Sequence, residues 1–149
     1  PPTLTTEILN QVISCKAKAV VVTGGEPLNY NMEPFTKELK KNNFKTYLET
    51  SGSSPFTGQW DWICLSPKRN KPPLKTAFKE ASELKIIIES VEDFAWAEEN
   101  AAKVGDNCKL YLQPEWSKAK EMMQTIVDYA LENPQWNISI QSHKYMRIP

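Results

Sequence analysis

The sequence has no excess of charge of either sign, because 18 basic residues balance 18 acidic ones among its 149 residues. A nucleic acid or an anionic membrane is therefore a disfavoured partner, since both attract proteins with a net positive charge. The chain also lacks an apolar run near the roughly twenty residues that cross a bilayer, and we see no charged and then apolar leader. We expect a cytoplasmic protein.

Closely spaced cysteines are missing as well. Cys15, Cys64 and Cys108 form no C-x-x-C pair, so they indicate neither a zinc site nor an iron–sulfur cluster loop. Their expected state is that of buried or half-buried thiols in a reducing compartment. His143 is the only histidine, which argues against Ser-His-Asp or Cys-His catalysis. The sequence therefore identifies no catalytic residue and no metal ligand.

The length of 149 residues is that of one domain. The sequence contains no internal repeat, linker or low-complexity tract. It begins at Pro1 without a methionine and enters a helical pattern almost at once. We expect a single domain over residues 1–149, preceded by an amino-terminal segment that this chain does not contain.

Strand and helix patterns alternate along the chain. The expected strands cover 20–22, 44–50, 60–65, 83–89, 108–112 and 137–140, and the expected helices cover 5–13, 32–41, 91–104 and 117–131. The strands at 20–22 and 83–89 have the character of buried strands, and Gly105 is expected to cap a helix. This alternation predicts right-handed crossovers and a mainly parallel sheet.

The run 19–27 (AVVVTGGEP) joins a β-strand to a turn that opens with two glycines. Adjacent glycines allow backbone conformations that other residues avoid, and they let a ligand approach the main chain. Glu26 would add a fixed anionic acceptor at the carboxyl end of a strand, where α/β folds bind ligands. The turn is thus a candidate socket for an ammonium group, although two glycines alone would indicate only a strand-to-helix turn.

Polar residues also follow the other strands. They are 49–52 (ETSG), 66–68 (SPK), 113–115 (QPE) and 141–144 (QSHK). Because parallel strands end at one rim, this pattern predicts a ligand pocket, although loop composition alone can also produce it. Glu49 could bind ribose hydroxyls, Ser51 a carboxylate and Lys68 an anionic group, but each is also common as an ordinary surface or turn residue.

Tryptophans account for five residues of the chain. Trp60, Trp62, Trp96 and Trp136 are expected to pack in the core or against helices. Trp116 follows a strand and could stack on a flat heterocycle, but packing in the core is slightly favoured.

Several motifs, in this order, resemble those of the 7-carboxy-7-deazaguanine synthase branch of the radical S-adenosylmethionine (SAM) enzymes. They are 23–28 (TGGEPL), 49–52 (ETSG), 66–68 (SPK), 84–87 (LKII), 112–114 (LQP), 139–145 (SIQSHKY) and 147–149 (RIP). GGEP alone indicates the superfamily, whereas SPK, LQP and QSHK narrow it to this branch. The resemblance covers nearly the whole chain.

The resemblance implies a partial TIM-like barrel of parallel strands alternating with helices. It implies that the intact protein is a carbon–nitrogen lyase of queuosine biosynthesis, a tRNA modification pathway, which converts 6-carboxy-5,6,7,8-tetrahydropterin to 7-carboxy-7-deazaguanine and ammonia. A [4Fe-4S] cluster would reduce SAM to a 5′-deoxyadenosyl radical, and Mg²⁺ would be a further cofactor. A homodimer and a flavodoxin-type electron donor are also implied.

The implied SAM-binding residues are Gly25, Glu26, Glu49, Ser51, Ser66, Pro67, Lys68, Gln113, Pro114, Glu115 and Trp116. The implied pterin-binding residues are Thr23, Gln141, His143 and the carboxylate of Pro149. The cluster cysteines and the Mg²⁺ contact of the family lie before the GGEP strand, outside this chain. Cys15 cannot replace them, because a cluster needs several thiolates. We therefore expect the 149-residue chain alone to be inactive.

Two alternatives remain open. The chain could come from another radical SAM enzyme, of the activating type, that shares the GGEP turn; an assay with carboxytetrahydropterin distinguishes the two. It could also be a module without a cluster that binds a nucleoside-like ligand. A three-cysteine loop upstream of Pro1 would argue against that second alternative.

Overall fold

The computed structural model describes residues 5–148. Contacts divide the chain into two compact units, of which the first ends at Glu80 and the second begins at Ala81. The expectation of a single domain therefore stays a prediction. Within the described residues, no helix combines the length and the apolar character needed to cross a membrane.

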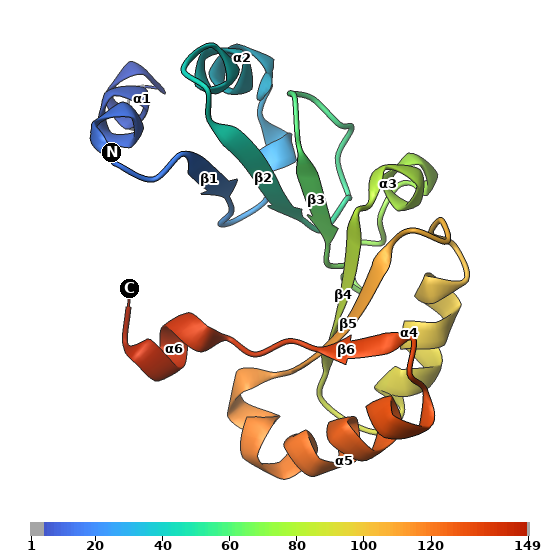
Figure 1. Cartoon of the computed structure of the whole chain (residues 1–149). Helices are drawn as coiled ribbons and strands as arrows, with labels where there is room; N and C mark the ends of the chain where they lie inside the picture. The colour runs from blue at the N-terminus through green and yellow to red at the C-terminus, as the bar shows by residue number, and fades with distance from the viewer. Residues whose placement is uncertain (1–4, 149) are drawn as a thin grey trace. The chain divides into compact units, whose positions relative to one another are not determined.

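The described part of the first unit contains a three-stranded parallel sheet. β1 (Ala19–Val22) pairs with β2 (Lys45–Thr50), and β2 pairs with β3 (Trp62–Leu65). The connecting elements are α1 (Thr5–Ser14), the 3-10 helix η1 (Pro27–Asn29), α2 (Glu33–Lys41) and α3 (Lys75–Glu80). Figure 1 shows α2 beside β2 and α3 beside β3, in agreement with their contacts. The predicted alternation is confirmed here.

The core of the first unit joins η1 to β2 and β3. Its buried members are Leu28, Leu48 and Ile63, and Met32, Phe56 and Trp60 pack against them. Leu28 comes directly after the GGEP turn, so its burial anchors one end of that turn in the core. The prediction that Trp60 packs in the core is confirmed.

Two apolar segments of the first unit are more exposed than their patterns suggest. The predicted strand at 20–22 is confirmed as part of β1, but its predicted burial is wrong, because Val21 is 58% exposed. Among the described strands of this unit, β1 pairs only with β2. In α1 the helix is confirmed, but Ile8 and Ile13 are 41% and 38% exposed. Burial depends on a covering neighbour, which periodicity does not report.

Gly52 lies where β2, β3 and α3 meet. Its φ is +69°, and an added Cβ would lie 2.6 Å from Leu65 Cδ1 and 2.7 Å from Ala77 Cβ. No helix is predicted at α3, because it has six residues and follows two prolines. Its buried residues Ala77 and Phe78 nevertheless bring the helix close enough to exclude any side chain at position 52.

The described part of the second unit contains three further parallel strands. β4 (Glu83–Ile88) pairs with β5 (Lys109–Pro114), which pairs with β6 (Trp136–Ile138). The other elements are α4 (Asp93–Ala101), the 3-10 helix η2 (Trp116–Lys118), α5 (Ala119–Glu132) and α6 (Ser142–Met146). Figure 1 shows α4 and α5 on one side of this sheet, where α4 contacts β4 and α5 contacts β5 and β6.

The core of the second unit combines one sheet face with α5. The largest fully buried side chains are Leu84, Ile86, Ile88, Leu112 and Ile126. Trp136, at 3% exposed, confirms its predicted core position. Its Nε1 donates to Glu98 Oε1 at 2.6 Å, and the Tyr129 hydroxyl donates to the same oxygen at 2.8 Å. Burial and Glu98 raise the pKa of Tyr129 to about 12.

Some boundaries in the second unit differ from those predicted. α4 ends at Ala101, and Gly105 has no positive φ, so the predicted glycine cap is wrong. β5 continues to Pro114, two residues beyond its predicted end. α6 was not predicted, because five residues are too few to show a helical period.

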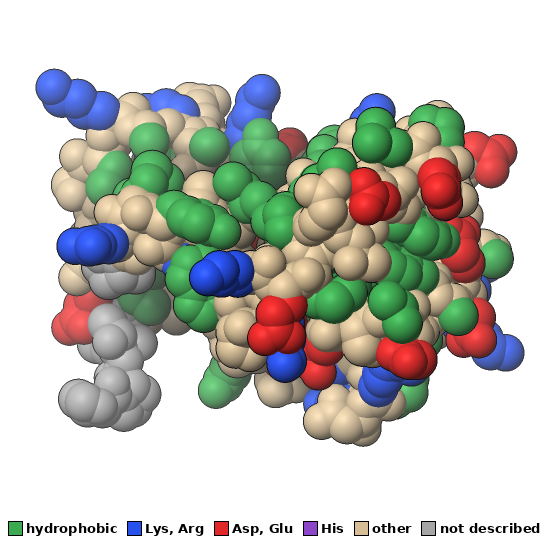
Figure 2. All heavy atoms as spheres, turned by 90° about the horizontal axis from the view of Figure 1, so that it is seen from below, with side chains coloured by type: hydrophobic (Ala, Val, Ile, Leu, Met, Phe, Trp, Pro, Cys, Tyr) green, Lys and Arg blue, Asp and Glu red, His purple; other side chains and the backbone are tan. Residues whose placement is uncertain are grey.

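At the molecular surface, hydrophobic side chains lie exposed among charged ones of both signs on the face that Figure 2 presents. The exposed large hydrophobic residues of the second unit include Ile138, Ile140, Tyr145 and Met146. The mixture of signs agrees with the equal numbers of acidic and basic residues in the sequence.

Gly52→Ala should destabilise the full-length protein by about 3 kcal/mol, because its methyl group would overlap buried atoms of β3 and α3. Urea unfolding would measure the loss. Gly105→Ala is the matched control, since an added Cβ there meets no atom within 4 Å, and it should change stability by less than about 1 kcal/mol. Equal effects of the two substitutions would contradict the crowding around Gly52.

Candidate functional site

The turn after β1 opens with two glycines in left-handed conformations. Gly24 has a φ of 89° and Gly25 a φ of 47°, which other residues rarely adopt. An added Cβ at either position would meet no atom within 4 Å, so backbone conformation rather than crowding requires glycine. Thr23 and both glycines are exposed. Their peptide groups are accessible to a ligand.

The carboxylate of Glu26 is occupied by donors from the chain itself. Oε1 accepts from the Thr50 hydroxyl at 2.6 Å and from Leu28 N at 3.2 Å. Oε2 accepts from Ser51 N at 2.8 Å and from the Ser51 hydroxyl. Glu26 therefore joins the turn after β1 to the end of β2. Its direct contact with a ligand stays a prediction.

The same hydrogen bonds favour the charged form of Glu26. Burial raises its pKa, but hydrogen bonds from Ser51, Thr50 and Leu28 lower it, and the net pKa lies below the ordinary value of 4.5. The hydrogen-bond donors around Glu26 therefore stabilise its carboxylate form.

The ends of β2 and β3 lie at the same edge of the first sheet. Thr50 is in register with Leu65, and Ser66 N donates to Thr50 O at 2.8 Å. Glu49 alternates with Thr50 along β2 and so points to the other face. The predicted site residues that this edge gathers are Thr23, Gly25, Glu26, Glu49, Ser51, Ser66, Pro67 and Lys68.

Lys68 and Ser53 extend this edge. Lys68 is exposed and begins a tight turn that returns at Lys71, whose N donates to Lys68 O at 3.3 Å. The hydroxyl oxygens of Ser51 and Ser53 lie 3.0 Å apart. The Lys68 ammonium group suits an anionic part of a ligand, whereas the one proton of the Ser51 hydroxyl is already donated to Glu26.

In the second unit, Gln113 lies at the end of β5 and is 7% exposed. Its Oε1 accepts from the Ser139 hydroxyl at 3.2 Å, and Pro114 follows as the last residue of the strand. Ser139 was not predicted as a site residue. Its position directly after β6, in the same polar run as Gln141, was the available signal.

Glu115 serves as the cap of η2. Its carboxylate accepts from Ser117 N at 2.8 Å, from Lys118 N at 3.2 Å and from the Ser117 hydroxyl. The Ser117 hydroxyl is the main cause that lowers the pKa of Glu115. Like Glu26, it stabilises the turn after a strand.

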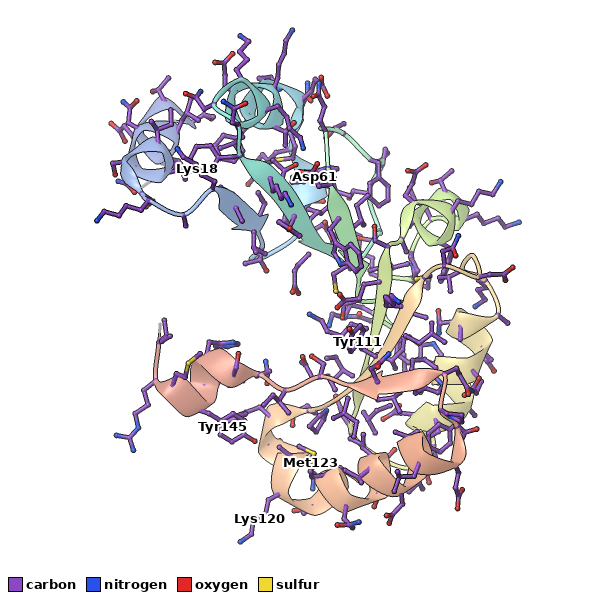
Figure 3. All side chains as sticks on the ribbon, in the orientation of Figure 1. Lys18, Asp61, Tyr111, Lys120, Met123 and Tyr145 are labelled. Atoms are coloured by element: carbon purple, nitrogen blue, oxygen red, sulfur yellow. The ribbon has the colours of Figure 1, made fainter. Side chains whose placement is uncertain are left out.

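Trp116 does not pack in the core, so the slightly favoured interpretation is wrong. It is 40% exposed, because it begins η2 and therefore lies outside the alternation of β5. The Tyr145 ring meets it edge-on at 5.2 Å, and Lys144 Nζ lies 4.8 Å from its centroid. Figure 3 shows Tyr145 reaching from α6 toward the start of α5.

Gln141 and His143 lie at the start of α6. Gln141 O accepts from Lys144 N at 3.0 Å, and His143 O accepts from Ile148 N at 3.0 Å. The His143 side chain is exposed. These residues follow β6, the neighbour of β5 in the sheet, whereas Pro149 lies outside the described residues.

The cysteines do not fit an iron–sulfur cluster. Cys15 is exposed, Cys64 is buried and Cys108 is intermediate. Burial, with a smaller effect of Glu83, raises the pKa of Cys108 to about 11, which disfavours the thiolate that metal binding needs. Over residues 5–148, no group of three His, Cys, Asp or Glu side chains could hold a metal ion.

Comparison with known proteins identifies the family. No protein-family model matches the chain. The chain is 52% identical, over 149 residues, to a 7-carboxy-7-deazaguanine synthase of Flavobacterium psychrophilum. The chain belongs to the 7-carboxy-7-deazaguanine synthase family. It is also 45% identical, over 148 residues, to the synthase of Synechocystis sp.. This confirms the family that the motifs indicated.

A solved structure, QueE from Escherichia coli, is similar to the chain with a TM-score of 0.82 and 28% identity. The match covers 93% of this chain and 64% of QueE, and it confirms the predicted α/β fold of radical SAM type. The chain spans 70% and 71% of the two synthases. As a member of this synthase family, the protein is an enzyme of the radical SAM class.

Trp116→Ala should loosen α6, because Trp116 contacts two residues of this helix, Tyr145 and Lys144. Loss of an aromatic pair and a cation–π contact, worth about 1–2 kcal/mol together, should speed amide exchange in α6 roughly 5–30-fold. Hydrogen-exchange mass spectrometry would measure it. Leu131→Ala, at a residue 77% exposed, is the control. Unchanged exchange in α6 would show that other contacts hold it.

Glu26→Gln should lower stability at neutral pH, because an amide cannot accept all of the hydrogen bonds that Glu26 accepts. The folded pKa of Glu26 is lowered, so its stabilisation is complete above the ordinary value of 4.5 and is lost as the pH falls through the folded value. Urea unfolding should therefore show that the difference in free energy of unfolding between wild type and variant becomes smaller from neutral to acid pH. A difference independent of pH would contradict the role of the charged form.

Proposed function

We propose that the full-length protein converts 6-carboxy-5,6,7,8-tetrahydropterin to 7-carboxy-7-deazaguanine and ammonia, as a carbon–nitrogen lyase. The observation that carries the proposal is the 52% identity, over the whole chain, to a protein named for this product. The polar edges of the two units agree with it, because both follow the carboxyl ends of parallel strands, where α/β enzymes bind their ligands.

SAM is the cofactor that the edge residues of this chain fit. When bound, SAM supplies the radical that removes a hydrogen atom from the pterin. In the first unit, the peptide groups of Gly24 and Gly25 bind its ammonium group, and Lys68 attracts its carboxylate. Glu49 takes hydrogen bonds from the ribose. The family resemblance also assigns residues 113–116 (QPEW) of the second unit to SAM.

The pterin contacts assigned by the family are Thr23, Gln141, His143 and the carboxylate of Pro149. Thr23 precedes the glycine turn, so its exposed side chain lies next to the peptides assigned to SAM. This proximity would keep the reacting carbon of the pterin close to the radical. A hydroxyl there can orient the substrate without taking part in proton transfer.

We infer that the cluster ligands lie outside this chain; the different environments of its three cysteines support this proposal. The relatives are longer than the chain, which spans 70% of the Flavobacterium synthase. We place the cluster cysteines and the Mg²⁺ contact in the part that is not spanned. The intact enzyme is a cytoplasmic homodimer that takes electrons from a flavodoxin-type donor and serves queuosine biosynthesis.

An anaerobic turnover assay tests this function. Full-length protein reconstituted with iron and sulfide should become brown and, with SAM and a reductant, should form 7-carboxy-7-deazaguanine from the pterin, measured by mass spectrometry. The 149-residue chain treated identically should stay colourless and inactive. A brown full-length protein that forms no deazaguanine would contradict the assignment and would favour another radical SAM reaction.

A further inference from the structure

We propose that Thr50 is a positioning residue for SAM binding: its hydroxyl holds the Glu26 carboxylate in place, so that peptide carbonyls of the glycine turn, rather than Glu26, bind the ammonium group of SAM. This inference rests on the proposed function. Nothing in the motif itself distinguishes the two modes of ammonium binding, whereas the hydrogen bonds of the structure do.

The first step is the acceptor capacity of Glu26. A carboxylate offers about four acceptor positions. Thr50, Leu28 and Ser51 supply four hydrogen bonds, two to each oxygen. An ammonium group could bind Glu26 directly only by displacing one of these donors. The carboxylate is therefore built as an anchor for the turn.

The second step is the orientation of the Thr50 hydroxyl. Thr50 is 4% exposed, and its Oγ1 accepts from Gly52 N at 2.9 Å. That bond occupies a lone pair, which leaves the hydroxyl proton directed at Glu26 Oε1, 2.6 Å away. The bond crosses from one strand end to the next. Thr50 thus fixes Glu26 from a strand of the sheet, whereas Leu28 lies in the short helix η1 and Ser51 follows the end of β2.

The third step is the freedom of the glycine turn itself. Gly24 and Gly25 have no side chains to pack, and no atom lies within 4 Å of the Cβ positions. Their peptide orientation is set from one side by β1 and from the other by Glu26 and Leu28. Residues that lock such a turn in one conformation improve ligand binding by preorganisation. The lowered pKa of Glu26 keeps the anchor charged.

The test compares SAM binding by the full-length protein and its variants. Thr50→Val keeps the shape of the side chain and removes the hydroxyl; it should weaken SAM binding about tenfold, the cost of a lost hydrogen bond to a charged group. Binding of 5′-methylthioadenosine, which lacks the ammonium and carboxylate groups, should not change. Thr50→Ser, which retains the hydroxyl, should bind SAM like wild type.

Thr46→Val is the matched control at the other end of β2. Thr46 is fully buried, and its hydroxyl donates to Gln59 O at 2.7 Å, away from the glycine turn. This variant should lose stability without losing affinity for SAM. The inference is wrong if Thr50→Val binds SAM as well as or better than wild type. It is also wrong if the variant loses as much affinity for 5′-methylthioadenosine as for SAM. If wild type itself does not bind SAM, the proposed function fails instead.

Discussion

The carboxylate of Glu26 is the interaction on which the polar edge of the first unit depends. It joins the turn after β1, the 3-10 helix η1 and the end of β2 through bonds to Leu28, Thr50 and Ser51. Two glycines precede it, and ordering each residue of a backbone costs about 1–2 kcal/mol. Without this anchor, the exposed peptides of the turn would lose their fixed orientation, and only β1 and the buried Leu28 would still restrain them.

In the second unit, Glu115 accepts a similar set of hydrogen bonds, but only from residues close to it in sequence. Glu115, like Glu26, caps a 3-10 helix that follows a strand, and it accepts from the backbone N two residues further on. Its other donors, however, are Ser117 and Lys118, so all its bonds are local. Glu26 instead takes donors from a neighbouring strand. Glu115 therefore stabilises a single turn, whereas Glu26 links the ends of β1 and β2.

Much of the fold could be predicted from the sequence, because strands such as β4 and helices such as α5 carry clear hydrophobic patterns. The position of Glu26 at the end of β1 could also be predicted, since GGEP is a local signal. Its hydrogen bonds to Thr50 and Ser51 could not, because they form between segments far apart in sequence. The exposure of Val21 and Trp116 escaped prediction for the same reason: burial is decided by neighbours. The short helices α3 and α6 leave no measurable period.

The ring of Trp116 already has an occupant on one face, the ammonium group of Lys144. A purine that stacks on that face must displace this cation, which belongs to α6. Nucleoside stacking and docking of α6 through Lys144 are then competing equilibria. The apparent affinity for a stacked base is lower when Lys144 occupies the ring for a larger share of the time. The stacking free energy of a ligand must therefore exceed the free energy with which Lys144 of α6 binds the ring.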